Sequence, residues 1–532
     1  MSITSSIFLI FLFFVFLIYF LIPKKFQWIF LLIASYIFYL FSGFGKILFL
    51  LFTTSITFFT GILLEKTDAE LETILNNNVK PLSKEQRKKF KDSSKRKKRI
   101  ILICALLLVL GILGVPKYYN FFAQNFNSLA NVFSLDVDLS LLKYLLPLGI
   151  SFYTFQSVGY IIDINRGKIK ADRNFAKFAL FLSFFPQIVQ GPISRYDQLA
   201  HQLYEPHSFN YERVKFGLQL MLWGFFKKLV IADRLSIAVN SIFGNSFQYE
   251  GLSIFIGVLF FSFQMYCDFS GGIDIARGIA ESMGISLVEN FRRPFFSKSI
   301  DEYWRRWHIS LGDWMRDYVF YPLALSKTFA RLGKFSRKHL GNKIGKIIPI
   351  IIANLITFMA VGVWHGPYWK YVAFGTYYGL LISIGLLFKP FFQKIVRALK
   401  INTDCFSWRL TQISFVFTAT TIGRYFVRAD GLRHALQLLR QTFSIFNPWI
   451  FYDGTLLNLG LRVEDYYLLL ISILFLILLE ILKETGINIR EKISHQNLVF
   501  RWSVYLIGIF AVLIFGIYGQ EYDAVEFIYR GF

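Results

Sequence analysis

The sequence is poor in the residues that build metal centres, disulfide frameworks and common hydrolase sites. Of its 532 residues, 3 are cysteine and 7 are histidine. Cys104, Cys267 and Cys405 show no Cys-x-x-Cys spacing and each lies in or beside an apolar stretch, so they predict neither a metal site nor a disulfide framework. The chain also lacks Gly-x-Ser-x-Gly, Gly-x-x-x-x-Gly-Lys-Ser/Thr and His-Glu-x-x-His. Serine hydrolysis, nucleotide-driven transport and zinc chemistry therefore lack their usual carriers.

Acidic residues are scarce relative to basic ones. Lys and Arg number 58 against 34 Asp and Glu, a formal net charge of +24. The densest basic block, residues 80–99, lies between two apolar segments. This position predicts a cytoplasmic loop that obeys the positive-inside rule, with contact to anionic lipid or a partner protein as alternatives. We do not expect a nucleic-acid partner.

Apolar residues are abundant instead. They make up 55% of the chain, which includes 62 Phe. Segments long enough to cross a bilayer of ~30 Å, roughly 20 residues each, recur from end to end. These runs are continuous and not alternating, so they favour helices over a β-barrel. The sequence predicts an all-α, polytopic integral membrane protein of about 11 to 13 transmembrane helices, with re-entrant and interfacial helices besides.

Charges and helix breakers predict the membrane topology. The first apolar run, Ile7 to Ile22, has no charged segment before it and no cleavage site after it, and is expected to be a retained helix. Residues 80–99 and 292–346 are predicted to be cytoplasmic and 117–139 to face outward, whereas 178–192 is predicted to be re-entrant. Further spans are predicted at about 27–43, 46–64, 100–115, 140–162, 213–235, 251–267, 346–364, 368–388, 410–427, 465–482 and 500–518.

The first candidate for chemistry is His365, in Val361-Gly-Val-Trp-His-Gly-Pro-Tyr-Trp369. It follows an apolar run, and an ionisable group at membrane depth is costly, which favours a functional role. Imidazole, with a reference pKa of ~6.5, can take a proton from a hydroxyl and return it to a leaving thiolate. Gly362, Gly366 and Pro367 are predicted to break the helix and free backbone N–H groups for an oxyanion. The alternative is a structural histidine that is hydrogen-bonded between helices.

The second candidate is His308, in Tyr303-Trp-Arg-Arg-Trp-His-Ile-Ser-Leu311. On a continuous helix Trp304 and His308 would share a face, and Arg305 would lie beside Asp301. An interfacial anchor is the alternative reading of His308. Arg305 and Arg306 are candidates for binding coenzyme A phosphates, although the positive-inside rule alone also explains them.

Six motifs follow one another along the chain: Leu146-Pro-Leu-Gly-Ile-Ser-Phe-Tyr-Thr-Phe155, Phe184-Phe-Pro-Gln-Ile-Val-Gln-Gly-Pro-Ile193, Tyr266-Cys-Asp-Phe-Ser-Gly271, Glu289-Asn-Phe-Arg-Arg-Pro294, Tyr303-Trp-Arg-Arg-Trp-His308 and Val363-Trp-His-Gly366. Their order is similar to that in bacterial membrane-bound O-acyltransferases, and the chain resembles the alginate O-acetyltransferase branch of that family. Arg424-Tyr-Phe-Val-Arg-Ala-Asp430 resembles a further segment of the same branch.

The resemblance implies the family's fold in three segments: N-terminal transmembrane helices in 1–135, which include the basic loop 80–99, a catalytic core in 136–390, and C-terminal transmembrane helices in 391–532. It implies His365 as the principal catalytic histidine and His308 as the second. A tunnel is expected to pass both of them. The residues proposed to bind the donor or to line this tunnel are Tyr303, Trp304, Arg305, Arg306, Trp307 and Trp364.

The implied function is transfer of an acyl group, as a rule acetyl, from a cytoplasmic thioester such as acetyl-CoA to a hydroxyl of a cell-surface polysaccharide or peptidoglycan. No bound cofactor or metal is expected. The expected partners are membrane lipids, the donor, the polymer and a separate extracytoplasmic acyltransferase, in a bacterial plasma membrane. Two alternatives stay open: D-alanyl transfer to teichoic acid from a carrier-protein thioester, and a transporter of a lipid-linked sugar or solute without a covalent step.

Overall fold

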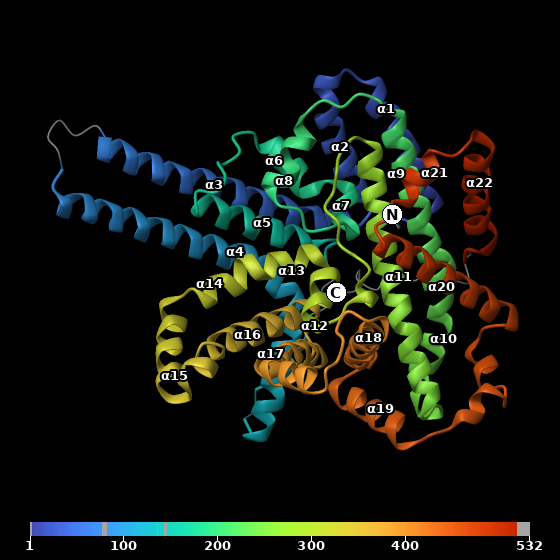
Figure 1. Cartoon of the computed structure of the whole chain (residues 1–532). Helices are drawn as coiled ribbons and strands as arrows, with labels where there is room; N and C mark the ends of the chain where they lie inside the picture. Colours follow the sequence, from blue (N-terminus) through green and yellow to red (C-terminus); the bar gives the residue numbers. More distant parts are fainter. Residues whose placement is uncertain (1–2, 77–81, 136, 143–145, 519–532) are drawn as a thin grey trace. The chain divides into compact units, whose positions relative to one another are not determined.

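The computed structural model describes residues 3–76, 82–135, 137–142 and 146–518 (Figure 1). The described residues are predominantly α-helical, and the β-type pairing found in them is an isolated antiparallel bridge between Phe291 and Trp307. This confirms the predicted all-α class. Contacts divide the chain into two compact units, Met1–Lys215 with Ile279–Val288 (unit 1) and Phe216–Gly278 with Glu289–Phe532 (unit 2). The three-segment division predicted from the motifs stays a prediction.

Unit 1 is built around a long antiparallel pair of helices, α3 and α4, which lie side by side (Figure 1). The shorter helix α5 packs against both of them. The helices of this unit are α1 (Ser6–Leu21), α2 (Gln27–Leu40), α3 (Ile47–Asn76), α4 (Lys84–Val132), α5 (Ile150–Asn165), α6 (Phe175–Ser183), α7 (Phe185–Gln190) and α8 (Tyr196–Tyr204), and α9 (Tyr211–Phe225) begins in it.

The basic block was predicted to be a cytoplasmic loop over 80–99; from Lys84 onward it is helical, and its cytoplasmic location stays a prediction. Helix α4 begins there, after a capping box in which Ser83 and Gln86 exchange side-chain and backbone hydrogen bonds. Lys, Arg, Glu and Gln are good helix formers, so a charged segment with this cap continues the helix. Lys97 and Lys98 also pair with Glu70 and Asp68 of α3. The basic residues from Lys84 onward therefore belong to α4 and not to a non-helical connection.

The same helix corrects a second boundary. The segment 117–139 was predicted to be an outer loop, but α4 continues through Pro116 to Val132. Asn120 and Asn127 then hold the following chain through hydrogen bonds to the backbones of Leu142 and Leu139. The 49 residues of α4 make a helix of about 73 Å, more than twice the ~30 Å hydrocarbon core of a bilayer.

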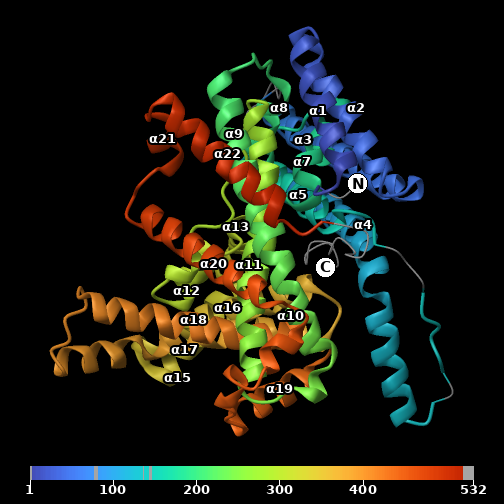
Figure 2. The ribbon, with the colours of Figure 1, turned by 90° about the vertical axis from the view of Figure 1, so that its right-hand side faces the viewer.

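Unit 2 contains the remaining helices, of which α16, α17 and α18 pack side by side (Figure 2). Its first stretch passes from α9 through a π-helical turn, Phe226–Ala232, into α10. The other elements are α10 (Asp233–Gly244), α11 (Leu252–Ser282), α12 (Ile300–Arg306), α13 (Ile309–Met315), α14 (Tyr321–Ala324), α15 (Lys327–Gly345), α16 (Ile348–His365), α17 (Trp369–Ala398), α18 (Phe406–Arg428), α19 (Leu432–Ser444), α20 (Val463–Glu484), α21 (Ile489–Ser494) and α22 (Leu498–Phe515).

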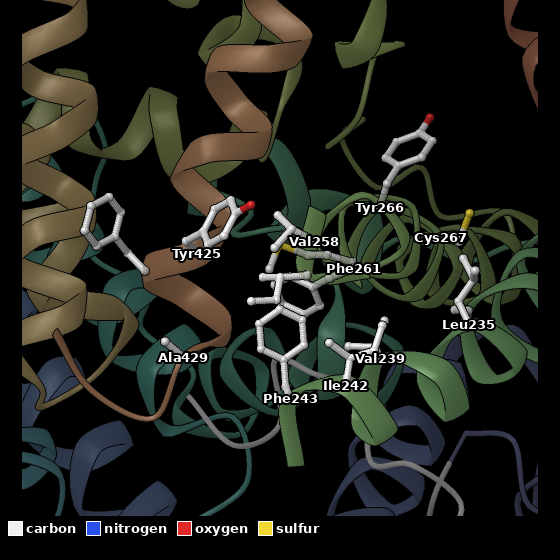
Figure 3. Close-up of a cluster of buried hydrophobic side chains, with 14 of the residues drawn as sticks. Leu235, Val239, Ile242, Phe243, Val258, Phe261, Tyr266, Cys267, Tyr425 and Ala429 are labelled. Atoms are coloured by element: carbon white, nitrogen blue, oxygen red, sulfur yellow. The ribbon is translucent and has the colours of Figure 1, made fainter. Parts of the chain in front are cut away.

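The core of unit 2 lies between α10, α11 and α18. Figure 3 shows Val239 and Phe243 of α10, Val258 and Phe261 of α11, and Tyr425 of α18 within this cluster. The same cluster continues into the aromatic residues of α12 and α17. Of the candidate site residues, Tyr303 and Trp307 are thus part of this buried core, and Trp304 packs against it.

Seven helices in the described residues are long and apolar enough to cross a membrane. They confirm a multi-pass membrane protein and match the predicted spans in α3, α4, α11, α16, α17, α20 and α22. Helix α1 is apolar but has 16 residues, and α2 has 14. The full count of 11 to 13 crossings stays a prediction.

Candidate functional site

The helix pair α16 and α17 places Trp364 and His365 at a sharp break in the chain. Helix α16 ends at His365, extended backbone follows at Gly366, and α17 begins at Trp369. The two helices approach so closely that a Cβ on Gly362 would lie 2.2 Å from the carbonyl oxygen of Tyr371. Gly362 was predicted to break the helix; it lies inside α16 instead, where the absent side chain permits this close packing.

His365 is enclosed by aromatic rings. Its side chain is buried, and its ring centroid lies 4.9 Å from that of Trp364 and 5.3 Å from that of Phe374. Tyr371 stacks nearly parallel to it at 6.2 Å. At the break itself, the N–H of Tyr368 donates to the carbonyl oxygen of Gly366. The backbone donors predicted for an oxyanion therefore stay a prediction.

The segment around His308 is not the continuous helix that the sequence predicts. Helix α12 ends at Arg306, Trp307 is extended, and His308 has a left-handed backbone with φ of 49° before α13 begins. The isolated bridge between Phe291 and Trp307 and the hydrogen bond from Arg292 N–H to the Arg306 carbonyl oxygen hold this break. A left-handed non-glycine residue costs of order 1 to 3 kcal/mol and is concentrated at functional sites.

His308 is 2% exposed, and its ring contacts include two aromatic rings and an amide. Its ring packs edge-on against Phe269 of α11 at 4.8 Å and against Trp364 at 5.6 Å, and Nδ1 lies 3.3 Å from Oδ1 of Asn290. Burial lowers the pKa of His308 to about 3, because the charged imidazolium is poorly solvated there. The imidazole of His308 is consequently neutral near pH 7.

The two histidines thus pack against one and the same ring, that of Trp364. Their centroids lie no more than 10.5 Å apart, the sum of the separations of 5.6 and 4.9 Å from Trp364. Helix length alone had allowed a separation of about 28 Å for a 19-residue span. Both imidazoles can therefore face a single substrate.

Tyr303 and Trp307 belong to the same aromatic cluster. Their rings are stacked at 5.6 Å with an interplanar angle of 15°. Arg424 of α18, which is 3% exposed, lies with its guanidinium 4.4 Å from the centre of the Trp307 ring and donates to the Tyr303 hydroxyl. Arg424 was not among the site residues predicted from the sequence, although a cation within a predicted span was a signal that could have identified it.

Trp304 extends the cluster toward α16 and α17. Its ring meets Phe358 at 5.3 Å and Tyr378 at 5.0 Å in edge-to-face geometry. The hydroxyl of Tyr378 in turn donates to the carbonyl oxygen of Thr420 in α18. Three of the predicted aromatic residues, at positions 303, 304 and 307, therefore connect α12 to the helices that carry His365 and Arg424.

The two arginines of this segment lie in different surroundings. Arg305 is exposed and pairs with Asp301, as predicted from their spacing. Arg306 pairs with Glu302 on its own helix and forms a bidentate contact with Glu484 of α20. Because two carboxylates already neutralise Arg306, Arg305 is the better placed of the two for a phosphate. The donor-binding role of both stays a prediction.

Two cavities lie in unit 2, and some of the residues that line them are close in sequence to the candidate site residues. One, of about 460 Å³, is lined mostly by apolar residues of α11, α18 and α20 and by Pro294 to Phe296. The other, of about 520 Å³, is lined by Tyr368, Trp369, Lys370 and the first turn of α19. Neither is lined by His308 or His365, so a passage lined by both histidines stays a prediction.

Comparison with known proteins adds an independent observation. The sequence profile of the membrane-bound O-acyltransferase family matches residues 166–337. A protein of Pseudomonas syringae pv. tomato, named a probable alginate O-acetylase AlgI, is 34% identical over 65% of this chain and 61% of its own length. A peptidoglycan O-acetyltransferase of Helicobacter pylori is 29% identical over 64% of each chain. A teichoic acid D-alanyltransferase of Bacillus subtilis is 31% identical over 46% of this chain and 60% of its own. The chain therefore spans about three fifths of the length of these relatives.

Proposed function

The chain belongs to the membrane-bound O-acyltransferase family, and we propose that it transfers an acetyl group from a cytoplasmic thioester, across the membrane, to a hydroxyl. The observation that supports this proposal is that two buried histidines, His308 and His365, both pack against the ring of Trp364. Burying two imidazoles inside a membrane protein is costly, and acyl transfer uses the protons that they can move.

The chemistry assigned to His365 is general base followed by general acid. The oxygen of the acceptor hydroxyl bonds to the thioester carbonyl carbon while its proton passes to His365. The tetrahedral intermediate then collapses, the C–S bond breaks, and the proton moves from His365 to the departing sulfur. Phe374 and Tyr371 exclude water around the ring, which limits simple hydrolysis of the donor.

His308 is assigned the second role, hydrogen bonding to the reacting groups as a neutral imidazole. Its lowered pKa, caused by burial, removes the option of a fixed positive charge at neutral pH. Arg424 and the stacked Tyr303 and Trp307 stabilise the segment that carries His308. Positional support of this kind matters, because the reacting atoms must be held about 3 to 3.5 Å apart.

We assign acetyl-CoA as the donor and a cell-surface polysaccharide or peptidoglycan as the final acceptor, by analogy with the acetylating relatives. A separate extracytoplasmic acyltransferase would receive the acyl group and deliver it to the polymer, and the plasma membrane is the proposed location. D-Alanyl transfer from a carrier protein is the second candidate, supported by the match to the teichoic acid enzyme over a smaller share of the chain.

The direct test is donor turnover by the purified protein in lipid nanodiscs. With acetyl-CoA and a soluble hydroxyl acceptor, such as a chitooligosaccharide, we expect free coenzyme A and acetylated acceptor in equal amounts. His365→Ala should abolish both while its elution volume and melting temperature stay those of the wild type. Binding of a solute without coenzyme A release, in wild-type protein, would instead support a transporter. Turnover of a D-alanyl carrier-protein thioester alone would favour the second candidate.

A further inference from the structure

Asn290 is completely buried and makes an unusual number of contacts with the segment that carries His308. Its side-chain oxygen Oδ1 accepts hydrogen bonds from the backbone N–H of Ser310 at 2.9 Å and from the Ser310 hydroxyl at 3.0 Å. The same oxygen lies 3.3 Å from Nδ1 of His308. The main-chain carbonyl of Asn290 accepts from the N–H of Ile309 at 3.0 Å. One residue therefore holds three consecutive positions, 308 to 310.

These contacts determine which way the Asn290 amide points. A backbone N–H can only donate, so the group that faces Ser310 N–H must be the carbonyl oxygen and not the amide nitrogen. The usual ambiguity between the two ends of an asparagine side chain is absent here. An amide oxygen has no proton to give. In the contact with His308, the proton must consequently lie on Nδ1.

The position of that proton determines the chemistry of the other ring nitrogen. A neutral imidazole with its proton on Nδ1 carries a lone pair on Nε2, which makes Nε2 the acceptor. Without a fixed partner at Nδ1, imidazole exchanges between two tautomers, and part of the population presents a donor where an acceptor is required. In metal-binding histidine sites, partners of this kind are worth about 10 to 100-fold in metal affinity or activity, which gives the scale expected here.

We propose that Asn290 is a positioning residue that fixes His308 in the Nδ1-protonated tautomer and so presents Nε2 as a hydrogen-bond acceptor to the acyl-transfer reaction. This inference rests on the proposed function for its kinetic consequence. It also explains the left-handed backbone of His308, because the bonds to Ile309 and Ser310 hold the strained turn in place. The motif Glu289 to Pro294 then contributes to the site through its second residue.

A purely structural role is the competing account, in which Asn290 merely caps the start of α13. The groups that face His308 distinguish the two. They include Phe269 from α11, Trp364 from α16 and Asn290, and none of these three is charged at neutral pH. Placing a carboxylate at position 290 would therefore introduce a new charge beside Nδ1, with the capping bonds preserved.

Two substitutions at this position separate the accounts. Asn290→Leu has a similar shape but no acceptor, and kcat should fall by about 10 to 100-fold with KM for acetyl-CoA little changed. Asn290→Asp keeps an acceptor for His308 and Ser310, so most of kcat should return. Its carboxylate favours the imidazolium and raises the pKa of His308. The pH at which the His308 ring titrates, followed by ¹⁵N NMR, should then rise. Asn497→Leu, which removes the cap of α22 on Phe500 N–H and lies outside the candidate site, is the matched control and should keep the wild-type kcat and the wild-type His308 titration.

A second measurement does not depend on turnover. In protein labelled with ¹⁵N-histidine and reconstituted in lipid, solid-state NMR reports which ring nitrogen carries the proton, and subtraction of a His308→Gln spectrum identifies the His308 signals. We expect protonated Nδ1 in the wild type and a mixture of tautomers in Asn290→Leu. Protonated Nε2 in the wild type, or a His308 ring in Asn290→Asp that titrates at the wild-type pH, would overturn the proposal. A wild type that shows the expected tautomer but no acyl transfer would overturn the proposed function alone.

Discussion

A single methyl group at Gly375 should push apart α16 and α17, the helix pair that carries His365. Gly375 of α17 faces α16 so closely that an ideal Cβ would lie 2.1 Å from the carbonyl oxygen of Phe358 and 3.1 Å from the Cα of Gly362. Real Cβ contacts essentially never fall below 3.0 Å. Gly375→Ala must therefore move the two backbones apart by about 0.9 Å, because the opposing atom belongs to a helix backbone and cannot rotate away.

The displacement gives the expected size of the effect. Overpacking of a well-packed core typically costs 1 to 3 kcal/mol, so we expect a loss of about 2 kcal/mol of stability. The activity should suffer more. Trp364 and His365 stand at the end of α16, next to the short turn that joins it to α17. A misplacement of ~1 Å at a reacting group can cost about 100-fold in rate.

The measurement is kcat for coenzyme A release together with the melting temperature in nanodiscs. Gly385→Ala is the matched control, because it adds the same methyl on the same helix where nothing lies within 4 Å. Alanine is the better helix former, so this variant should be as stable as the wild type or slightly more so. Wild-type kcat and melting temperature in Gly375→Ala, or equal damage in Gly385→Ala, would refute the argument from close packing.

Three further predictions follow. His365→Ala should remove at least 99% of acetyl transfer, and His308→Ala should leave measurable activity; equal and complete loss in both would make His308 a full catalytic partner. Arg424→Gln loses a buried cation–π contact and a hydrogen bond, and it should lower both the melting temperature and kcat. The expected loss of stability is about 2 to 4 kcal/mol. Arg409→Gln, on the exposed face of the same helix, is the control and should be neutral in both assays. If the basic end of α4 is cytoplasmic, Ser93→Cys should resist an impermeant maleimide in intact cells and Ser128→Cys should react, and reversed labelling would invert the topology.

Much of the fold was predictable, because apolar run length is a property of the sequence alone. The spans predicted at 346–364 and 368–388 correspond to α16 and α17. Boundaries outside the apolar runs were less predictable. Nothing in the charge of residues 84–99 distinguishes a solvated loop from a solvated helix, and the capping box at Ser83 and Gln86 was the local signal that favoured the helix.

Sequence motifs named the residues of the candidate site, but they did not indicate how these residues are arranged in space. His308 and His365 were identified by motif, whereas their common contact with Trp364 depends on tertiary packing. The break at Trp307 and His308 could not be read from helical periodicity, because the partner that stabilises it, the bridge to Phe291, is distant in the sequence. Asn290 was likewise seen as part of a motif, and its role depends on hydrogen bonds that spacing does not reveal.

The aromatic composition of the site has a physical reason of its own. A base inside a membrane must be kept neutral, oriented and dry, and polar neighbours would serve only the second of these needs. At His308 the rings of Phe269 and Trp364 exclude water and disfavour imidazolium, while they leave the ring nitrogens available to hydrogen bonds. Orientation must then come from the few polar groups that remain. At His308 that group is Asn290. Its loss should consequently lower kcat more than it lowers the stability of the fold.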